Sequence, residues 1–259
     1  MEPKDLFTDE SGNPRVLMGC GISSGSPRFA ELAARMGFDV VWIEMEHAAA
    51  DLAGAEAMCV AAEAGGAIPL IRAAGYGRQH ILHPLEVGAR IVVVPLVNDA
   101  TAAREVVRHG KFRPLGRRGF NTRSRAFTFG ADPQAMERAN NETYLMPQVE
   151  SLEAAKNLDG ILAVQGLSGI FIGPGDLSAD LGRPSRFDDA QLRDTVCQCI
   201  AKSRDAGLHA GILVGEGPLL DAALDAGADL CIVGSDMGAA ISTWRAQLER
   251  LGAFSIRDC

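Results

Sequence analysis

Ionisable side chains in this sequence follow short apolar runs at several places, each where a strand would end. The run VVWIEMEH carries Glu44, Glu46 and His47 directly after four apolar residues. The run IPLIR ends in Arg72, and GIFIGPGD places Asp176 just past an apolar segment. Because burying charge is expensive, ionisable residues joined so closely to apolar runs favour a functional site.

The run YLMPQVE adds an amide and a carboxylate to this set. Side chains alternate between the two faces of a strand, so Met146, Gln148 and Glu150 should share one face. Carboxylates together with a histidine suit a hard, octahedral cation such as Mg²⁺ or Mn²⁺. A site with few side-chain ligands leaves coordination positions open for a chelating substrate. The pattern therefore indicates a divalent-metal site that admits a small anionic molecule.

The elements that position these residues are strand-length apolar segments alternating with Ala-rich helical segments. The predicted strands are Val16–Cys20, Asp39–Met45, Ile68–Ala73, Arg90–Pro95, Thr143–Val149, Gly169–Ile172, His209–Val214 and Asp229–Val233. The predicted helices are Pro27–Met36, Leu52–Ala64, Ala100–Arg108, Leu152–Ile161, Asp189–Ala206, Pro218–Ala226 and Gly238–Leu251. Eight such strands most economically form a closed (β/α)8 TIM barrel, whose chemistry lies at the carboxyl ends of the strands. An open doubly wound sheet is the alternative, but its usual GxGxxG after the first strand is replaced here by GCGISSGS.

The segment Lys111–Asn141 interrupts this rhythm. It holds two Phe-flanked arginine pairs and no clear strand, and a connection this long is usually functional or mobile. We find no internal repeat and no inter-domain linker, so residues 1–259 are predicted to form one domain.

Charge and composition limit the partners and the compartment. A net charge of −8 argues against broad binding to nucleic acid or anionic membranes. The first residues, MEPKDLFTDESGNPR, lack the apolar core of a signal peptide, and no apolar run is long enough to span a membrane. Six cysteines show no paired CxxC pattern, as expected of thiols in a reducing compartment. We expect a cytoplasmic protein that binds neither membrane nor nucleic acid.

Seven stretches resemble the HpcH/HpaI family of metal-dependent (class II) pyruvate aldolases. They are FDVVWIEMEHA, IPLIR, EVGARIVVVPLV, PLGRRG, PQVES, GIFIGPGDLSADLG and ADLCIVGSD, in the family's order. The resemblance implies a TIM barrel of the phosphoenolpyruvate/pyruvate-domain type. It implies a carbon–carbon lyase that reversibly cleaves 4-hydroxy-2-oxo acids to pyruvate, or a related 2-oxo acid, and an aldehyde through an enolate. It also implies a homohexamer, a trimer of dimers, that exchanges its last helix between neighbours.

The resemblance assigns roles to the polar residues. Glu150 and Asp176 would hold Mg²⁺, Mn²⁺ or Co²⁺, which pyruvate would chelate. Arg72 would stabilise the enolate charge. His47 would act as acid and base on the aldol hydroxyl, with Glu44 orienting its imidazole. Relatives often carry Asp where this chain has Glu44, so we expect the activity to survive and the aldehyde preference to shift.

Further residues would bind the substrate. Gln148 would position the substrate or a metal-bound water, and Gly173 and the turn around Gly175 would offer N–H groups to the pyruvate carboxylate. Arg118, in PLGRRG, would reach the substrate region or a neighbouring subunit. Glu86 stands where relatives often have Asp.

The lysines bear on the type of aldolase. A Schiff-base aldolase needs a desolvated amine inside the barrel. The chain has only Lys4, Lys111, Lys156 and Lys202, and none of them ends a predicted strand. A metal ion is therefore the expected means of stabilising the enolate.

Several alternatives stay open. Glu150 and Asp176 could be acids at helix N-termini, and Arg72 could be an ion-pair partner of Glu86. The nearest functional rival is a Mg²⁺-dependent CoA-ester lyase of the citryl-CoA or malyl-CoA type. A second is a barrel that binds a 2-oxo acid without catalysis. A third is a sugar isomerase, disfavoured because no convincing phosphate loop follows the last two strands.

Overall fold

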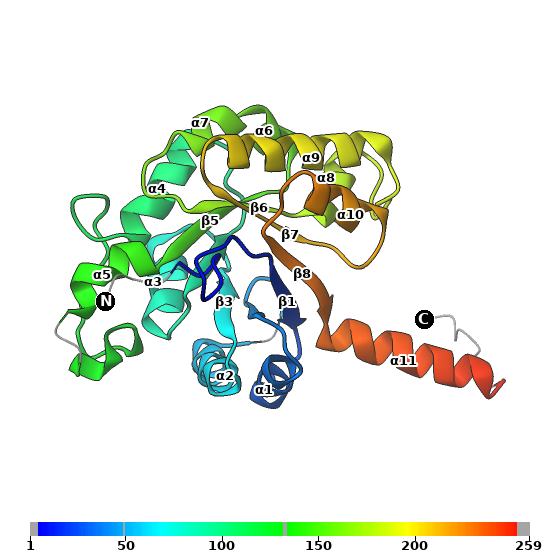
Figure 1. The fold of residues 1–259 in the computed structure, drawn as a ribbon, viewed down its shortest axis with the longest axis horizontal. Helices are drawn as coiled ribbons and strands as arrows, with labels where there is room; N and C mark the ends of the chain where they lie inside the picture. Colours follow the sequence, from blue (N-terminus) through cyan, green and yellow to red (C-terminus); the bar gives the residue numbers. More distant parts are fainter. Residues whose placement is uncertain (1–4, 49, 132–133, 253–259) are drawn as a thin grey trace.

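The chain folds as a closed barrel of eight parallel strands in sequence order (Figure 1). The computed structural model describes residues 5–48, 50–131 and 134–252. Because β1 pairs with β8 as well as with β2, the predicted (β/α)8 barrel is confirmed and the open sheet is excluded. The strands are β1 (Leu17–Ile22), β2 (Val40–Glu44), β3 (Ile68–Arg72), β4 (Ile91–Val94), β5 (Tyr144–Val149), β6 (Gly169–Ile172), β7 (His209–Leu213) and β8 (Leu230–Ser235).

Helices connect the strands, and most lie where the sequence predicts them. These are α1 (Pro27–Arg35), α2 (Leu52–Gly65), α4 (Ala100–Gly110), α9 (Ala190–Asp205), α10 (Pro218–Asp225) and α11 (Asp236–Arg250). The predicted helix over 152–161 is two short helices, α6 (Leu152–Lys156) and α7 (Leu158–Leu162), which meet at Asn157. Three helices lie outside the predicted helical ranges: α3 (Arg78–Glu86), α5 (Ala135–Glu142) and α8 (Pro174–Asp180). No helix within the described residues is long and apolar enough to cross a membrane.

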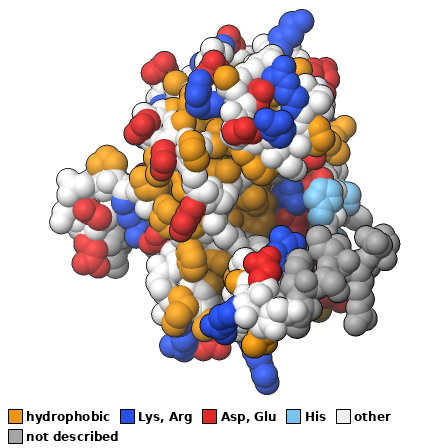
Figure 2. Space-filling view, turned by 90° about the vertical axis from the view of Figure 1, so that its right-hand side faces the viewer, with side chains coloured by type: hydrophobic (Ala, Val, Ile, Leu, Met, Phe, Trp, Pro, Cys, Tyr) orange, Lys and Arg blue, Asp and Glu red, His pale blue; other side chains and the backbone are white. Residues whose placement is uncertain are grey.

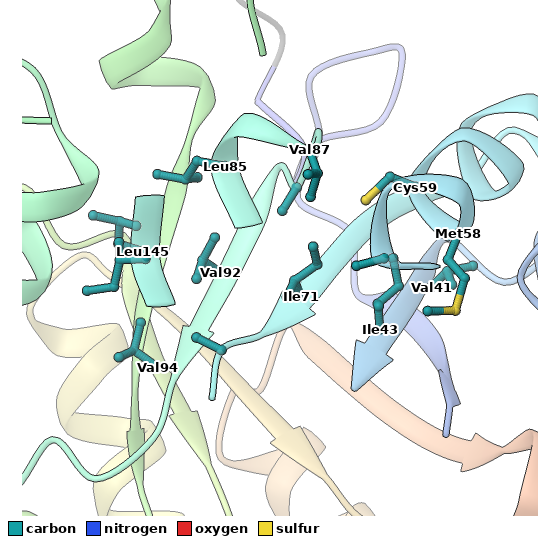
Figure 3. Close-up of a cluster of buried hydrophobic side chains, with 14 of the residues drawn as sticks. Val41, Ile43, Met58, Cys59, Ile71, Leu85, Val87, Val92, Val94 and Leu145 are labelled. Carbon is teal, nitrogen blue, oxygen red and sulfur yellow. The ribbon is translucent and has the colours of Figure 1, made fainter. Parts of the chain in front are cut away.

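The two faces of each strand pack into different cores. On β2, Val40 and Trp42 belong to the barrel interior, whereas Val41 and Ile43 pack outward against α2 and its neighbours (Figure 3). The interior is apolar along its length, and Phe7 closes its amino end, where its ring stacks on His209 at 3.6 Å between centroids. The carboxyl ends of the strands are therefore where polar side chains gather.

The segment Lys111–Asn141 runs from the end of α4 to the start of β5, and so lies at the amino end of the barrel. It contains a 3-10 helix, η1 (Arg125–Gly130), and most of α5, and its described residues form no strand, as predicted. The buried amine of Lys111 donates to the carbonyl groups of Asn140 and Thr143. The segment thus lies at the end of the barrel opposite to the predicted active-site rim.

The last helix departs from the pattern of the barrel. In Figure 1, α11 extends away from the strands instead of lying along them. Its apolar side chains recur at helical spacing and are at least 42% exposed: Met237, Ile241, Trp244, Leu248 and Leu251. A helix with an apolar stripe of this kind normally buries it against another surface.

Candidate active site

Two neighbouring strands bring a buried carboxylate and an arginine together at the rim. Glu44 ends β2, Arg72 ends β3, and the two are partners in the strand register. Arg72 donates from Nε to both oxygens of Glu44, at 3.0 and 2.8 Å, and its Nη2 lies 2.6 Å from Oε2. Burial alone would raise the pKa of Glu44, but the hydrogen bonds and charge of Arg72 hold that pKa below its usual value.

Further N–H donors saturate the Glu44 carboxylate. Its Oε1 accepts the backbone N–H groups of Glu46 and His47 at 2.7 and 3.1 Å, and its Oε2 accepts the Trp42 indole N–H at 3.1 Å. The carboxylate therefore fixes the start of the β2–α2 loop as well as the guanidinium of Arg72.

These contacts change the role expected for Glu44. The sequence predicts that it orients the imidazole of His47, but its oxygens bind the His47 backbone and Arg72 instead. The carboxylate within ion-pair distance of the imidazole is that of Glu46, whose Oε2 lies 3.8 Å from Nε2. The alternative partner for Arg72 is also excluded, because Glu86 pairs with Arg118.

A second group of polar side chains lies at the end of β5. Glu150 is buried, and its Oε1 accepts the backbone N–H of Leu96 at 2.7 Å, while Gln148 donates from Nε2 to its Oε2. Burial raises the pKa of Glu150, and the negative charges of Glu46 and Asp176 raise it further. The amide oxygen of Gln148 is buried without a hydrogen-bond partner among the described residues. This part of the rim therefore has more negative charge and more acceptors than it has donors.

These residues fit a divalent cation. Asp176 lies in the first turn of α8 and shares the rim with Glu150, and carboxylate oxygens are the ligands that hard cations prefer. No cluster of three or more Asp, Glu, His or Cys side chains in the described part of the chain is arranged to hold a metal. Two carboxylates would leave the remaining positions to water and substrate.

The two predicted glycines differ in what they can contribute. Gly173 donates its N–H to the carbonyl of Val149 at 3.0 Å, so this group is not free for a substrate carboxylate and that prediction is wrong. A Cβ at this position would lie 2.7 Å from Nε2 of Gln148 and 3.0 Å from Cβ of Glu150, so glycine permits the close approach. Gly175 is exposed in the first turn of α8, where N–H groups lack intrahelical acceptors.

Arg118 lies far from this rim within its own subunit. It lies in the amino-end segment, where Nη2 is 3.0 Å from Oε1 of Glu86. Its guanidinium carbon lies 5.0 and 5.7 Å from the ring centroids of Phe112 and Phe127. A substrate contact by Arg118 would therefore require the rim of a neighbouring subunit.

None of the described lysines lies among the rim residues. Lys156 and Lys202 are exposed on helices, and Lys202 pairs with Asp159 at 2.7 Å. Lys111 lies at the amino end, and burial lowers its pKa to about 8. Lys4 lies outside the described residues.

Comparisons with known proteins agree with this geometry. A family model described as HpcH/HpaI aldolase/citrate lyase matches residues 18–243. The chain is 34% identical to the hydroxypyruvate/pyruvate aldolase of Roseobacter denitrificans over 93% of this chain and 94% of that protein. It is 38% identical to the 2-keto-3-deoxy-L-rhamnonate aldolase of Klebsiella pneumoniae over 85% of this chain and 82% of that protein.

Two solved structures share the fold over almost the whole chain. One is a HpcH/HpaI aldolase/citrate lyase family protein from Burkholderia cenocepacia, with a TM-score of 0.85, 27% identity and coverage of 92% of this chain and 95% of that one. The other is the citrate synthase SbnG, with a TM-score of 0.82, 28% identity and coverage of 92% and 94%.

The charge imbalance at Glu150 predicts how the protein responds to metal. After chelation, adding Mn²⁺ at about 100 times its Kd should stabilise the wild type by about 2.7 kcal/mol. Glu150→Gln should abolish this gain, and its metal-free form should melt no lower than the metal-free wild type, because a buried, repelled charge is gone. Thermal unfolding with and without Mn²⁺ measures both effects.

The matched control is Glu153→Gln, which removes an exposed carboxylate on α6. It should keep the full metal response. A Glu150→Gln protein that gains as much stability from Mn²⁺ as the wild type would rule out Glu150 as a metal ligand.

Proposed function

This chain belongs to the HpcH/HpaI aldolase/citrate lyase family, as its sequence motifs predict, and on that premise we propose that it is a divalent-metal-dependent aldolase. It cleaves 4-hydroxy-2-oxo acids to pyruvate, or a related 2-oxo acid, and an aldehyde, and it also joins the two. One observation carries the proposal: the buried carboxylate of Glu150 faces the like charges of Glu46 and Asp176 on the same rim as the fixed guanidinium of Arg72.

The chain's own residues divide the work. Glu150 and Asp176 hold Mg²⁺, Mn²⁺ or Co²⁺; when bound, the cation polarises the keto group of the substrate and acidifies the adjacent methyl group. Arg72, whose side chain is 11% exposed and fixed by two carboxylates, stabilises the negative charge that develops on the keto oxygen. A rigid donor of this kind needs little reorganisation during the reaction.

The remaining groups handle the proton and the substrate's orientation. His47, at the start of the β2–α2 loop with a side chain 65% exposed, moves the proton of the aldol hydroxyl. The unpartnered amide oxygen of Gln148 accepts a hydrogen bond from substrate or water. The N–H of Gly175 binds the substrate carboxylate, since it lies at the start of a helix.

The alternatives are less well supported. A phosphate site at the β8–β1 end is disfavoured because Asp236 accepts the N–H groups of Ser23 and Ser24 at 2.9 and 3.1 Å, and its charge would repel a phosphate. The names of the two aldolase relatives support an aldolase over a CoA-ester lyase or a non-catalytic barrel. Release of acetyl-CoA from a CoA ester would reverse that preference.

We also propose that the protein is a homo-oligomer, in which α11 packs on a neighbouring subunit. The apolar stripe of α11 is exposed among the described residues, and the helix extends away from the barrel (Figure 1). Figure 2 shows hydrophobic side chains gathered on the face of the molecule that carries α11. Exchange of a terminal helix is an economical route to closed assemblies. The hexamer, a trimer of dimers, is the assembly we propose.

The compartment and domain organisation complete the proposal. We propose that residues 1–259 form one domain that works in the cytoplasm. The described cysteines, which are Cys20, Cys59, Cys197, Cys199 and Cys231, are free thiols, which supports a reducing compartment. The net charge of −8 supports small-molecule partners, namely a 2-oxo acid and an aldehyde, rather than nucleic acid.

A retro-aldol screen tests the activity. The chain should release pyruvate from 4-hydroxy-2-oxo acids with Mn²⁺ and lose this activity in EDTA. Glu150→Ala and Asp176→Ala should each be inactive. Arg72→Lys should lower kcat/KM by about 10²–10³-fold, because an ammonium cannot replace a planar guanidinium that spans two carboxylates.

The control for Arg72→Lys is Arg90→Lys, which changes an arginine that precedes β4 at the opposite end of the barrel. Its kcat/KM should stay within twofold of the wild type. Undiminished pyruvate release after exhaustive chelation would contradict the proposed function.

The apolar stripe of α11 predicts which substitutions disrupt the proposed oligomer. Trp244→Glu should place a charge in the proposed contact and dissociate the oligomer. Its molecular mass, measured by sedimentation, should therefore fall below that of the wild-type oligomer. Ala246→Glu, on the opposite side of the same helix, should leave the mass unchanged. A Trp244→Glu protein of wild-type mass would rule out a contact through this stripe.

A further inference from the structure

Glu46 is a half-buried acid of the rim to which the sequence assigns no role and which the proposed reaction uses only to fix Arg72. It follows β2 by two residues, and its side chain is 16% exposed. Its Oε2 lies 3.2 Å from Nη1 of Arg72 and 3.8 Å from Nε2 of His47. Neither contact has hydrogen-bond geometry, so this oxygen is buried without a hydrogen-bond partner in the described part of the chain. An unsatisfied buried carboxylate oxygen is costly, which points to a donor that comes within hydrogen-bond distance only when substrate binds.

The other acid of the loop cannot serve the imidazole. Both oxygens of Glu44 are occupied by the guanidinium of Arg72, by two backbone N–H groups and by the Trp42 indole. Turning this carboxylate toward the His47 ring would break those bonds. Oε2 of Glu46 has no such hydrogen bonds to break, and it already lies 3.8 Å from Nε2 of the ring; only its ion pair with Nη1 of Arg72 has to be kept.

The backbone around the histidine is already fixed. Glu44 accepts the N–H groups of both Glu46 and His47, so the loop start is rigid and only side-chain torsions remain to be set. The imidazole is 65% exposed, and an exposed ring acts efficiently as a base only when one nitrogen is held so that the other faces the reacting atom.

We propose that Glu46 is the positioning residue of His47. Oε2 of Glu46 accepts Nε2–H of the imidazole when substrate closes the site, which leaves Nδ1 facing the aldol hydroxyl. In cleavage, Nδ1 takes the hydroxyl proton as the carbon–carbon bond breaks, the aldehyde leaves, and the bonding electron pair passes to the enolate of the 2-oxo acid. In synthesis, Nδ1 returns that proton to the new alkoxide.

The shared oxygen also joins two functions of the site. Arg72, which stabilises the charge on the keto oxygen, and His47, which moves the proton, both face Oε2 of Glu46. The carboxylate can therefore stabilise the imidazolium that forms in cleavage while holding the guanidinium in place. This inference rests on the proposed aldolase function.

A double-mutant cycle tests it with Glu46→Gln, His47→Ala and the double variant. Glu46→Gln should lower kcat for pyruvate release by about 10–100-fold, which is less than the about 10²–10⁴-fold that a complete acid–base catalyst contributes, and leave the KM for the 4-hydroxy-2-oxo acid within twofold. In the His47→Ala background, the same change should cost less than about twofold, because a group that acts through another has nothing to add once that other is gone. Additive losses would overturn the inference.

Two further measurements separate positioning from other roles. The Kd for Mn²⁺, measured by calorimetry on Glu46→Gln, should match the wild type; a tenfold weaker affinity would assign Glu46 to the metal site instead. Glu216→Gln, which changes an exposed acid on the β7–α10 loop at the same end of the barrel, should leave kcat unchanged.

The outcomes also distinguish this inference from the proposed function. A wild type that releases no pyruvate with Mn²⁺ contradicts the function itself, whereas an active wild type with an additive cycle contradicts only the role of Glu46. If Glu46→Gln does not fold, Glu46→Asp takes its place. It keeps the charge but withdraws the carboxylate, so it should lower kcat in the wild type and have no effect in the His47→Ala background.

Discussion

The active-site rim is organised by an imbalance of buried charge. Arg72 is the one described cation that pairs with the acids of this rim, and its contacts go to Glu44 and Glu46. Glu150, buried beside Asp176, has only an amide, a backbone N–H and like charges around it. A buried carboxylate facing like charges in that position is expensive for the folded chain, and a divalent cation shared with the exposed carboxylate of Asp176 would remove the cost. We therefore place the proposed metal beside Glu150, where the negative charge has no cation among the described residues.

The barrel confines this imbalance to one end. The interior is filled by apolar side chains up to Trp42 and Phe171, and Phe7 closes the amino end. Strand pairing sets Glu44 beside Arg72, and the absence of a side chain at Gly173 lets the β6–α8 turn approach Gln148 and Glu150 closely. The rigid core thus holds the like charges of Glu46, Glu150 and Asp176 on one rim despite their mutual repulsion.

Much of this arrangement could be predicted from the sequence, because its signals are strong and local. Alternating apolar strands and Ala-rich helices predict the barrel, and polar residues at strand ends predict the rim. Helix α8 was missed because it is only seven residues long, and α3 because it carries a proline in its interior. Neither gives a clear apolar periodicity.

The finer contacts of the site were beyond the sequence for a different reason. The N–H of Leu96 that binds Glu150 belongs to the backbone, so no side chain marks it. The choice of Glu44 to bind Arg72 and the loop backbone, rather than the imidazole, depends on how five donors converge in space. Arg118 belongs to a matching motif, yet the chain path places it at the far end of the barrel with Glu86.

The most direct test of the charge-compensation claim is electron paramagnetic resonance of Mn²⁺ bound to the chelated and reloaded protein. One Mn²⁺ per chain should bind, and pyruvate labelled with ¹⁷O should broaden its lines in the wild type. Labelled pyruvate that leaves the Mn²⁺ lines unchanged, binds equally well to the metal-free protein and is trapped on a lysine by borohydride would contradict the claim.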